Sequence, residues 1–431
     1  MKRQVAITGL GAVTPLGNDL THTWDGVVEG RSGITRLTQF DASTFPVQIA
    51  GEVKNFTPDP ITLPAELARL VGRSTEFCLA TTRMALEDAG LDLARCDTGR
   101  VGIAMGGDEE YLHFARFNEL FAKDYVYQAF ADGSTAHNLM LAKSCDLAKQ
   151  WAFRKKTDIG SKLLAIQHQI RGPVETSHTS CSSSGHAIGK AKRLIENNDC
   201  DIMIAGGHCS MISEFSVAGF YLLGTLSTRN DDPAGSSRPF DLNRDGFIIG
   251  EGSGILILEE LEHARKRGAT IYALLSGFGS SSNAYRLTDT PPDGRGGDLA
   301  MQRSLDDAGL NREQVDYINA HGTGTLLNDA SETRSVKNLF GEQAYKIPIS
   351  SSKSMLGHLV CSSSAVELVI TTMALHTGIL PPTINRETPD PKCDLDYVPL
   401  IARQQTIDVA LSNSFAFGGQ NASLTIQRYR G

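Results

Sequence analysis

The sequence predicts an α/β fold built from two similar halves. Apolar runs typical of strands alternate with amphipathic stretches typical of helices along the 431 residues. Near the middle of the chain, Ser180-Cys181-Ser182-Ser183-Ser184 has a counterpart in Val360-Cys361-Ser362-Ser363-Ser364, and an apolar helix pattern follows each. Such an alternation in both halves indicates a duplicated α/β unit. We therefore expect an N-terminal half over residues 1–258 and a C-terminal half over residues 259–431.

The spacing of apolar residues gives the elements of the N-terminal half. Gln4 to Thr8 is typical of a strand, and the glycine-rich residues 9–17 predict a turn before a helix. This start lacks the third glycine of a dinucleotide fingerprint, which argues against a Rossmann oxidoreductase. The further predictions are a helix over Ser74 to Ala89, a strand over Val101 to Met105, a helix over 185–197, a strand over Asp201 to Ala205 with a glycine turn at Gly206-Gly207, and a strand over Gly252 to Leu258.

Residues 106–150 form an unusual, aromatic-rich stretch that we expect to be an insertion in the N-terminal half. The aromatic side chains recur at helical spacing, which predicts a helix with a large apolar face. Such a face can pack in the core or at a dimer interface, or it can form a wall over a substrate tunnel. The residues are Tyr111, Phe114, Phe117, Phe121, Tyr125, Tyr127 and Phe130.

The C-terminal half repeats the alternation. It opens with a helix over Glu259 to Arg267 and a strand and glycine turn over Ile271 to Gly279. The pattern then predicts helices over 297–309 and 363–376, and strands over Val315 to Asn319, Ile347 to Ser350, 408–412 and 422–428.

Composition excludes several classes of protein. A net charge of -8 without a block of Lys or Arg argues against a nucleic-acid surface. No apolar stretch reaches 18 residues, so we expect no membrane span, and the short apolar run after Met1 has no clear cleavage site. The eight cysteines form no CxxC pair and no even spacing, which favours a reducing cytoplasm over a disulfide framework and predicts no metal.

Cys181 is the candidate nucleophile. It lies between a strand-like segment and a helix pattern, among small residues that allow a substrate to approach. Unpaired N–H groups and the dipole at a helix N-terminus favour a thiolate. The alternative is a buried structural cysteine, since free cysteine is among the most buried residue types. His321 and His358 also follow strand patterns, where α/β folds present binding groups, and the three together predict a Cys/His/His constellation.

Several motifs in this chain resemble those of the β-ketoacyl-acyl-carrier-protein synthases, and most closely those of the type I/II elongating enzymes of the thiolase superfamily. The resemblance extends over essentially the whole chain. It is carried by Cys181 in its small-residue setting, Ala320-His321-Gly322-Thr323-Gly324-Thr325, Lys353-Ser354-Met355-Leu356-Gly357-His358, Asn413-Ser414-Phe415-Ala416-Phe417-Gly418-Gly419, Arg238-Pro239-Phe240-Asp241, Arg244-Asp245-Gly246-Phe247 and Thr8-Gly9-Leu10-Gly11.

The resemblance implies a fold, partners and a reaction. The fold would be the thiolase-like duplicated αβαβα layered fold. The enzyme would hold no bound cofactor, and its substrates would be carried on the phosphopantetheine of an acyl carrier protein. A homodimer is implied, and a heterodimer with a chain-length-factor-like subunit stays open. The reaction would be a decarboxylating Claisen condensation of an acyl thioester with a malonyl thioester.

The resemblance also assigns roles to individual residues. Cys181 would carry the acyl group, and His321 and His358 would donate N–H groups to the enolate oxygen. The backbone N–H groups of Cys181 and Phe415 would form the oxyanion hole, and Phe415 would also be the gate of the acyl pocket. The remaining assignments are Lys353 paired with Glu367, Thr323 and Thr325 on the pantetheine arm, and Phe247 in the substrate pocket. Cys361 falls where relatives usually carry glycine, so we expect it to be a structural variation.

Three departures bear on the substrate. Glu109 falls at the boundary of the acyl pocket, where a carboxylate is costly beside a plain fatty chain. The segment before Cys181 is longer than usual, and Gly224 replaces a frequent arginine of the carrier-docking surface. The carrier is acidic, so we expect a basic patch, with Lys190, Lys192, Arg193 and Arg229 as candidates.

These departures favour a synthase for a specialised polyketide, polyene or unusual fatty acyl chain. The alternatives are ordinary fatty-acid elongation and the catalytic subunit of a ketosynthase/chain-length-factor pair. Two other classes fit less well. A thiolase needs a second cysteine that Phe415 to Gly419 lacks, and chain-length factors lack the nucleophile that Cys181 provides.

Overall fold

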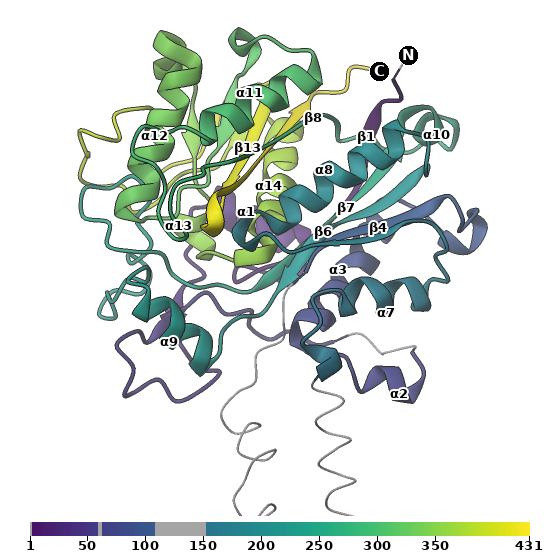
Figure 1. Cartoon of the computed structure of the whole chain (residues 1–431), viewed down its shortest axis with the longest axis horizontal. Coiled ribbons are helices and arrows are strands. Elements are labelled where there is room, and N and C mark those ends of the chain that lie inside the picture. Colours follow the sequence, from purple (N-terminus) through teal and green to yellow (C-terminus); the bar gives the residue numbers. More distant parts are fainter. Residues whose placement is uncertain (1, 59–62, 108–151) are drawn as a thin grey trace, which may run out of the picture.

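The computed structural model describes residues 2–58, 63–107 and 152–431. A ten-stranded sheet runs through the molecule in the order β10-β9-β13-β14-β8-β1-β7-β6-β4-β5 (Figure 1). One half of the sheet contains β1 (Val5–Val13), β4 (Val101–Gly106), β5 (Val174–Ser177), β6 (Ile202–Cys209) and β7 (Gly252–Glu260). The other half contains β8 (Ala273–Ser282), β9 (Tyr317–Asn319), β10 (Ile349–Ser350), β13 (Val409–Phe415) and β14 (Gln420–Gln427).

The pairing of strands is the same in both halves. In each, the first strand pairs antiparallel with the last one (β1 with β7, β8 with β14). The last strand is also antiparallel to its other neighbour, β6 in the first half and β13 in the second. Two further strands run parallel to that neighbour: β4 and β5 in the first half, and β9 and β10 in the second. The halves meet where Ala6 and Ile7 pair with Leu274 and Ala273. The fold is thus the duplicated α/β unit predicted from the sequence.

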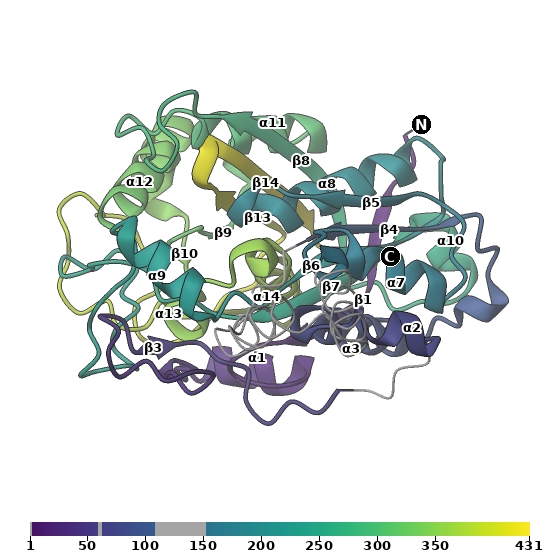
Figure 2. The same ribbon diagram turned by 60° about the horizontal axis from the view of Figure 1, so that its bottom comes forward.

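Helices separate and cover the two halves of the sheet. The layers run from α11 (Gly297–Ala308) at the top of Figure 2, through α8 (Ser183–Glu196) and α14 (Ser363–Thr377) in the middle, to α3 (Arg73–Asp88) at the bottom. The middle helices contact strands of both halves, so their apolar faces are buried on all sides. The other α-helices of the described residues are α1 (Leu20–Val28), α2 (Ala65–Ala68), α7 (Ile159–Gln167), α9 (Glu214–Leu222), α10 (Leu261–Lys266), α12 (Leu326–Phe340) and α13 (Lys353–Leu356).

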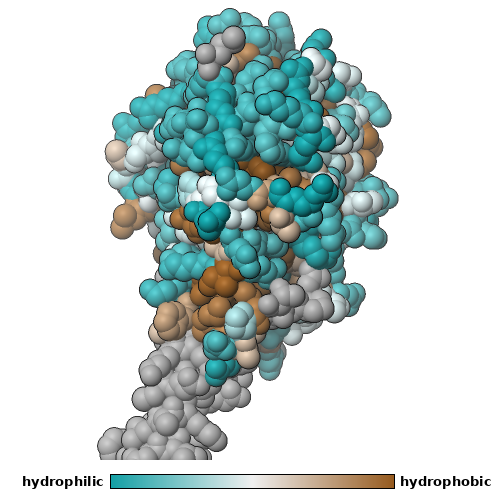
Figure 3. All heavy atoms as spheres, turned by 90° about the vertical axis from the view of Figure 1, so that its right-hand side faces the viewer, coloured by the Kyte–Doolittle hydropathy of each residue, from teal (hydrophilic) through white to brown (hydrophobic). Residues whose placement is uncertain are grey.

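Small elements complete the described chain. The two-stranded pairs are β2 (Thr35–Arg36) with β3 (Ile49–Ala50) and β11 (Ile379–Leu380) with β12 (Arg403–Gln404). The side of the molecule shown in Figure 3 is largely hydrophilic, with hydrophobic residues gathered low on it. Within the described ranges, none of the helices is both long and apolar enough to cross a membrane.

The predicted glycine turns are wrong, because the strands continue through the glycines. Gly9 and Gly11 lie inside β1, where a Cβ atom would come within 2.3 Å of the Ala85 carbonyl oxygen and 2.4 Å of that of Thr81, both on α3. In β8, a Cβ on Gly277 would meet the Ser304 carbonyl oxygen of α11 at 2.0 Å. These glycines allow a helix to lie directly on the strand.

Two other expectations concern boundaries. The turn predicted at Gly206-Gly207 is also wrong, since β6 extends to Cys209. Strand β7 ends at Glu260, two residues beyond the boundary expected after residue 258. The aromatic stretch that we expect over residues 106–150 lies, apart from its first two residues, outside the described residues.

Candidate active site

Cys181 lies in a tight turn between β5 and α8. The turn is a short 3₁₀ segment, Ser180–Ser182, that passes directly into the helix. Ser180 has a φ of +52°, a strained conformation for a residue other than glycine. Gly106 in β4 and Gly207 in β6 have no side chains, so Ser184 and the start of α8 can approach the sheet closely. Such strain is typical of functional sites, where surrounding packing holds it in place.

The counterpart around Cys361 repeats this geometry. Its turn, Val360–Ser362, leads into α14, and Val360 has a φ of +43°. The two helix starts are in direct contact, because the Ser364 hydroxyl donates to the Cys181 carbonyl oxygen at 3.2 Å and the Ala365 N–H donates to Ser184 Oγ at 3.1 Å. The duplication thus brings the two cysteine turns together at the centre of the molecule.

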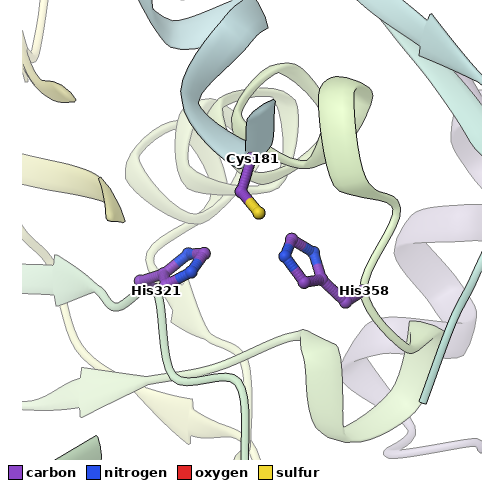
Figure 4. Close-up of side chains that lie close together, drawn as sticks. All are labelled: Cys181, His321 and His358. Carbon is purple, nitrogen blue, oxygen red and sulfur yellow. The ribbon is translucent and has the colours of Figure 1, made fainter. Parts of the chain in front are cut away.

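Two histidines face the Cys181 thiol. His321 follows β9, and His358 follows α13; both are buried, and their ring centroids lie 5.3 Å apart. The Cys181 sulfur and one nitrogen of each imidazole all lie within 4.8 Å of one another. In Figure 4 the sulfur points between the two rings. The structure therefore brings together the three residues of the predicted constellation and leaves Cys361 out of it.

Hydrogen bonds fix each histidine from behind. Glu332 on α12 accepts from the backbone N–H groups of His321 and Gly322, each at 2.8 Å. The Nδ1 atom of His358 lies 2.8 Å from the hydroxyl of Ser363. Among the described residues, neither His321 Nδ1 nor His358 Nε2 has a hydrogen-bond partner. Each ring therefore keeps one buried nitrogen available for a ligand.

A buried ion pair lies beside the histidines. Lys353 at the start of α13 pairs with Glu367 on α14, as the resemblance implies. Burial raises the pKa of the Glu367 carboxyl to about 7, against the effect of Lys353. Burial lowers the pKa of the His321 and His358 imidazoles well below 6.5, and the positive charge of Lys353 lowers both further. Both imidazoles are therefore neutral at pH 7.

Burial also dominates the ionisation of the nucleophile. Burial, with a smaller contribution from Cys361, raises the pKa of the Cys181 thiol to about 12. Lys353 and hydrogen bonds from the backbone N–H groups of Phe417 and Cys181 oppose this effect. The expectation of a resting thiolate at the helix start is therefore wrong. Cys181 rests as a thiol, and its proton has to pass to a base before the sulfur attacks.

A cavity of about 250 Å³ opens onto Cys181. Phe247 lines it, with its ring centroid 5.2 Å from that of His358, and Thr323 and Thr325 line it with their hydroxyls 3.0 Å apart. Phe415, the predicted gate, lines it as well, so the structure places four further predicted site residues on one cavity. The lining also includes Phe220, Val360 and Phe417. Glu109 lies outside the described residues.

The backbone N–H that reaches the Cys181 sulfur from this motif is that of Phe417, whereas the oxyanion donor was expected from Phe415. Phe415 is the last residue of β13 and pairs with Asn421 of β14, so its backbone belongs to the sheet. Beyond the strand the chain turns back, and the N–H of Phe417 points at the Cys181 sulfur. Phe415 contributes its ring, whose centroid lies 6.1 Å from that of His321. The sequence alone assigns no role to Phe417, Ser363 or Glu332, although all three contact the catalytic residues. Phe417 and Ser363 lie in motifs identified from the sequence, whereas Glu332 lies in none of them.

Three of the four basic residues expected to bind an acidic carrier are engaged elsewhere and do not form a patch at the cavity. Lys192 is fully buried between Glu196 and Asp307, Lys190 pairs with Glu175, and Arg193 lies over the ring of Phe278. All three lie on α8, and none lines the cavity. Arg229 donates to the Asn243 carbonyl oxygen instead of facing the cavity.

The Cys181, His321 and His358 donors also have the chemical types that Zn²⁺ prefers. The positive charge of Lys353 acts directly on both imidazoles, however, and would oppose a divalent cation at this position. The arrangement fits better with a thiol nucleophile and two neutral N–H donors, because these gain from a nearby positive charge.

Comparisons with known proteins agree in family and fold. The N-terminal domain of the β-ketoacyl synthases matches residues 2–264, and their C-terminal domain matches residues 272–387. The chain is 42% identical to a protein of Coxiella burnetii named 3-oxoacyl-[acyl-carrier-protein] synthase 2, over 99% of each chain. It is also 42% identical to a protein of that name from Synechocystis, over 100% of this chain and 99% of the relative.

Solved structures give the same result. A β-ketoacyl synthase from Burkholderia phymatum superposes with a TM-score of 0.87 at 32% identity, over the full length of both chains. A complex of a type II PKS acyl-carrier protein with its ketosynthase, bound to a hexaketide, superposes with a TM-score of 0.86 at 31% identity, also over both full lengths.

The thiol state of Cys181 predicts a steep pH dependence of alkylation. Only the thiolate reacts, so the rate of modification by iodoacetamide should rise about tenfold per pH unit from pH 7 to 10. Intact-protein mass spectrometry with the Cys181→Ser variant as the blank measures this rate. A rate that levels off below pH 8 would contradict a pKa near 12.

Proposed function

The chain belongs to the β-ketoacyl synthase family, and we propose that Cys181, His321 and His358 together catalyse its decarboxylating Claisen condensation. In this proposal an acyl thioester is loaded on Cys181 and condensed with a malonyl thioester, both delivered on the phosphopantetheine of an acyl carrier protein. The observation that carries the proposal is the approach of one sulfur and two imidazole nitrogens to within 4.8 Å of one another at the end of a cavity.

Acyl transfer comes first. The Cys181 thiol gives its proton to a neutral imidazole nitrogen, and the sulfur attacks the thioester carbonyl carbon. The new C–S bond gives a tetrahedral intermediate. When this intermediate collapses, the bond to the pantetheine sulfur breaks, and that sulfur leaves with the proton held by the imidazole. The negative oxygen of the tetrahedral intermediate is stabilised by the backbone N–H groups of Cys181 and Phe417. This assignment replaces Phe415 as the second donor.

Condensation follows on the same sulfur. The malonyl thioester loses its carboxylate as CO₂, and the electrons of the broken C–C bond pass to an enolate. The neutral imidazoles of His321 and His358 donate N–H hydrogen bonds to the enolate oxygen. These hydrogen bonds strengthen as negative charge develops on that oxygen. The enolate carbon then attacks the acyl-enzyme carbonyl carbon and a C–C bond forms. The bond to the Cys181 sulfur breaks, and the sulfur leaves as a thiolate that takes a proton from solvent.

Lys353 has an electrostatic role in this proposal. Lys353 is buried, and its ion pair with Glu367 allows the ammonium group to stay charged in a region of low dielectric. Its positive charge lowers the pKa of both imidazoles and of the Cys181 thiol. The same charge favours the negative enolate, so Lys353 assists the step without transferring a proton itself.

The pantetheine arm would lie along the outer part of the cavity. Thr323 and Thr325 line the cavity, and Thr325 also caps α12 by accepting from the Asn328 N–H. Their hydroxyls can bind the amide groups of the arm, as the family resemblance implies. The proposed enzyme needs no other group, because the carrier brings both reacting thioesters. A free thiol nucleophile favours a reducing compartment, so we place the protein in the cytoplasm.

Two classes of acyl chain are in question. The carboxylate of Glu109 at the expected pocket boundary favours a specialised polyketide, polyene or unusual fatty acyl chain. The names of the relatives from Coxiella burnetii and Synechocystis favour ordinary fatty-acid elongation. We keep the specialised chain as the proposal and elongation as its alternative.

We further propose that the protein forms a homodimer through β5. Within the described part of the chain this strand is an edge of the sheet, and its four residues are half-buried or exposed. An unpaired edge offers a row of backbone N–H and C=O groups to a second strand. Pairing with β5 of a second copy would satisfy these groups; a subunit like a chain-length factor could take the same place. Sedimentation of the purified chain should give twice its 46.5 kDa, and a single-chain mass would contradict the homodimer.

The nucleophile and the chain class can be tested in one measurement. We expect a panel of acyl-loaded carrier proteins to add an acyl mass to the wild-type chain and to the Cys361→Ala variant, but not to the Cys181→Ala variant. Intact-protein mass spectrometry reads this directly, with Cys361 as the matched control because its turn repeats that of Cys181. Labelling of the Cys181→Ala variant would contradict the assignment. Saturated long chains loading best would favour elongation over the specialised chain.

A further inference from the structure

Five leucines from three separate segments are exposed around the cavity mouth. They are 52–83% exposed, and we refer to them as the leucine rim: Leu222 and Leu223 at the end of α9, Leu287 on the loop after β8, and Leu326 and Leu327 at the start of α12. Single exposed apolar residues are common on protein surfaces. Several that converge on one opening from different parts of the chain mark an interaction site.

The contacts of these segments place the leucine rim at the route to Cys181. Leu223, Leu326 and Leu327 line the cavity that holds the thiol. The carbonyl oxygen of Leu287 accepts from the Gly418 N–H at 2.6 Å, next to Phe417, which lines the same cavity. In Figure 2, α9 and α12 lie next to each other on the same side of the molecule. Anything that delivers a thioester to Cys181 through this mouth has to stop against these side chains.

The charges at the mouth do not favour an acidic protein. Apart from the two histidines, the ionisable groups among the described lining residues are Cys181, Asp245 and Asp289. Arg286 is close by, but it pairs with Asp289 at 3.0 Å. The chain as a whole carries a net charge of -8. Arg334 and Lys392 lie outside the mouth, in an adjoining groove that shares Leu326 and Leu327.

From this arrangement we propose that the leucine rim is the docking surface for the acyl carrier protein, and that apolar contacts supply most of the affinity. This inference rests on the proposed function. The carrier would place an apolar helix face, beside its prosthetic group, over the five leucines. Its acidic groups would lie at the edge, toward Arg334 and Lys392. An apolar centre with a charged edge is the common anatomy of protein interfaces.

The proposal predicts a selective defect in delivery. The double variant Leu222→Gln/Leu287→Gln changes two rim residues that do not line the cavity, and it adds no charge. Glutamine at residue 222 remains compatible with helix α9. Cys181 of this variant should be acylated at least tenfold more slowly by an octanoyl-loaded bacterial acyl carrier protein at limiting concentration. Acylation by octanoyl-N-acetylcysteamine, a small thioester without the carrier, should stay within twofold of wild type. Raising NaCl from about 50 to 500 mM should slow the carrier reaction of the wild type less than threefold, because apolar contacts are not screened.

The matched control is Ile401→Gln. Ile401 is 78% exposed on a loop that contributes nothing to the cavity lining. Its variant should behave as wild type with both thioesters. Unchanged acylation of the double variant by the carrier would overturn the proposal, and so would an equal loss with both thioesters, which would indicate damage to the site itself. Failure of the wild type to react with both octanoyl thioesters and with every acyl carrier of the panel above would instead contradict the proposed function.

Discussion

The contact between the starts of α8 and α14 is the interaction on which the site depends. The Ser364 hydroxyl holds the carbonyl oxygen of Cys181, and the Ala365 N–H holds the side chain of Ser184. Each helix belongs to one of the two duplicated halves, so neither half contains the site alone. Cys181 comes from the first half, whereas both histidines and Lys353 come from the second. Small residues at both helix starts are needed because a larger side chain would separate them.

This arrangement buries the reacting groups, and their burial determines which protonation states they adopt. The thiol and both imidazoles lose water, so their neutral forms are favoured at rest. One positive charge, that of Lys353, remains nearby and is paired with Glu367. A neutral imidazole beside a cation can donate its N–H to an oxygen on which negative charge develops. An imidazolium that is already paired with a counter-ion would be a poorer donor to that oxygen. The site is thus organised for negative charge that exists only during the reaction.

Much of this could be predicted from the sequence, for identifiable reasons. Strand and helix periodicity gave the duplicated fold, and the repeated Cys-Ser-Ser-Ser segments indicated the two helix starts that meet. The glycines of β1 and β8 were misread as turns because glycine also permits close packing of a helix on a strand, which only the fold reveals. Phe415 and Phe417 stand in one motif, and only the end of β13 decides which N–H faces the sulfur. Neither the burial of Lys192 nor the role of Glu332 has a local sequence signal, since each depends on a distant part of the chain.

In the proposed reaction the two neutral histidines serve the decarboxylation, whereas Cys181 carries the acyl group. Release of CO₂ from a malonyl-loaded carrier by the acylated enzyme measures this division of roles. The single variants His321→Ala and His358→Ala each retain one imidazole to take the thiol proton, so both should still be acylated at Cys181. Their rates of CO₂ release should fall by about 10²–10³-fold, the usual loss for one donor to a developing oxyanion. CO₂ release at the wild-type rate from either variant would show that the histidine it lacks has no part in the decarboxylation.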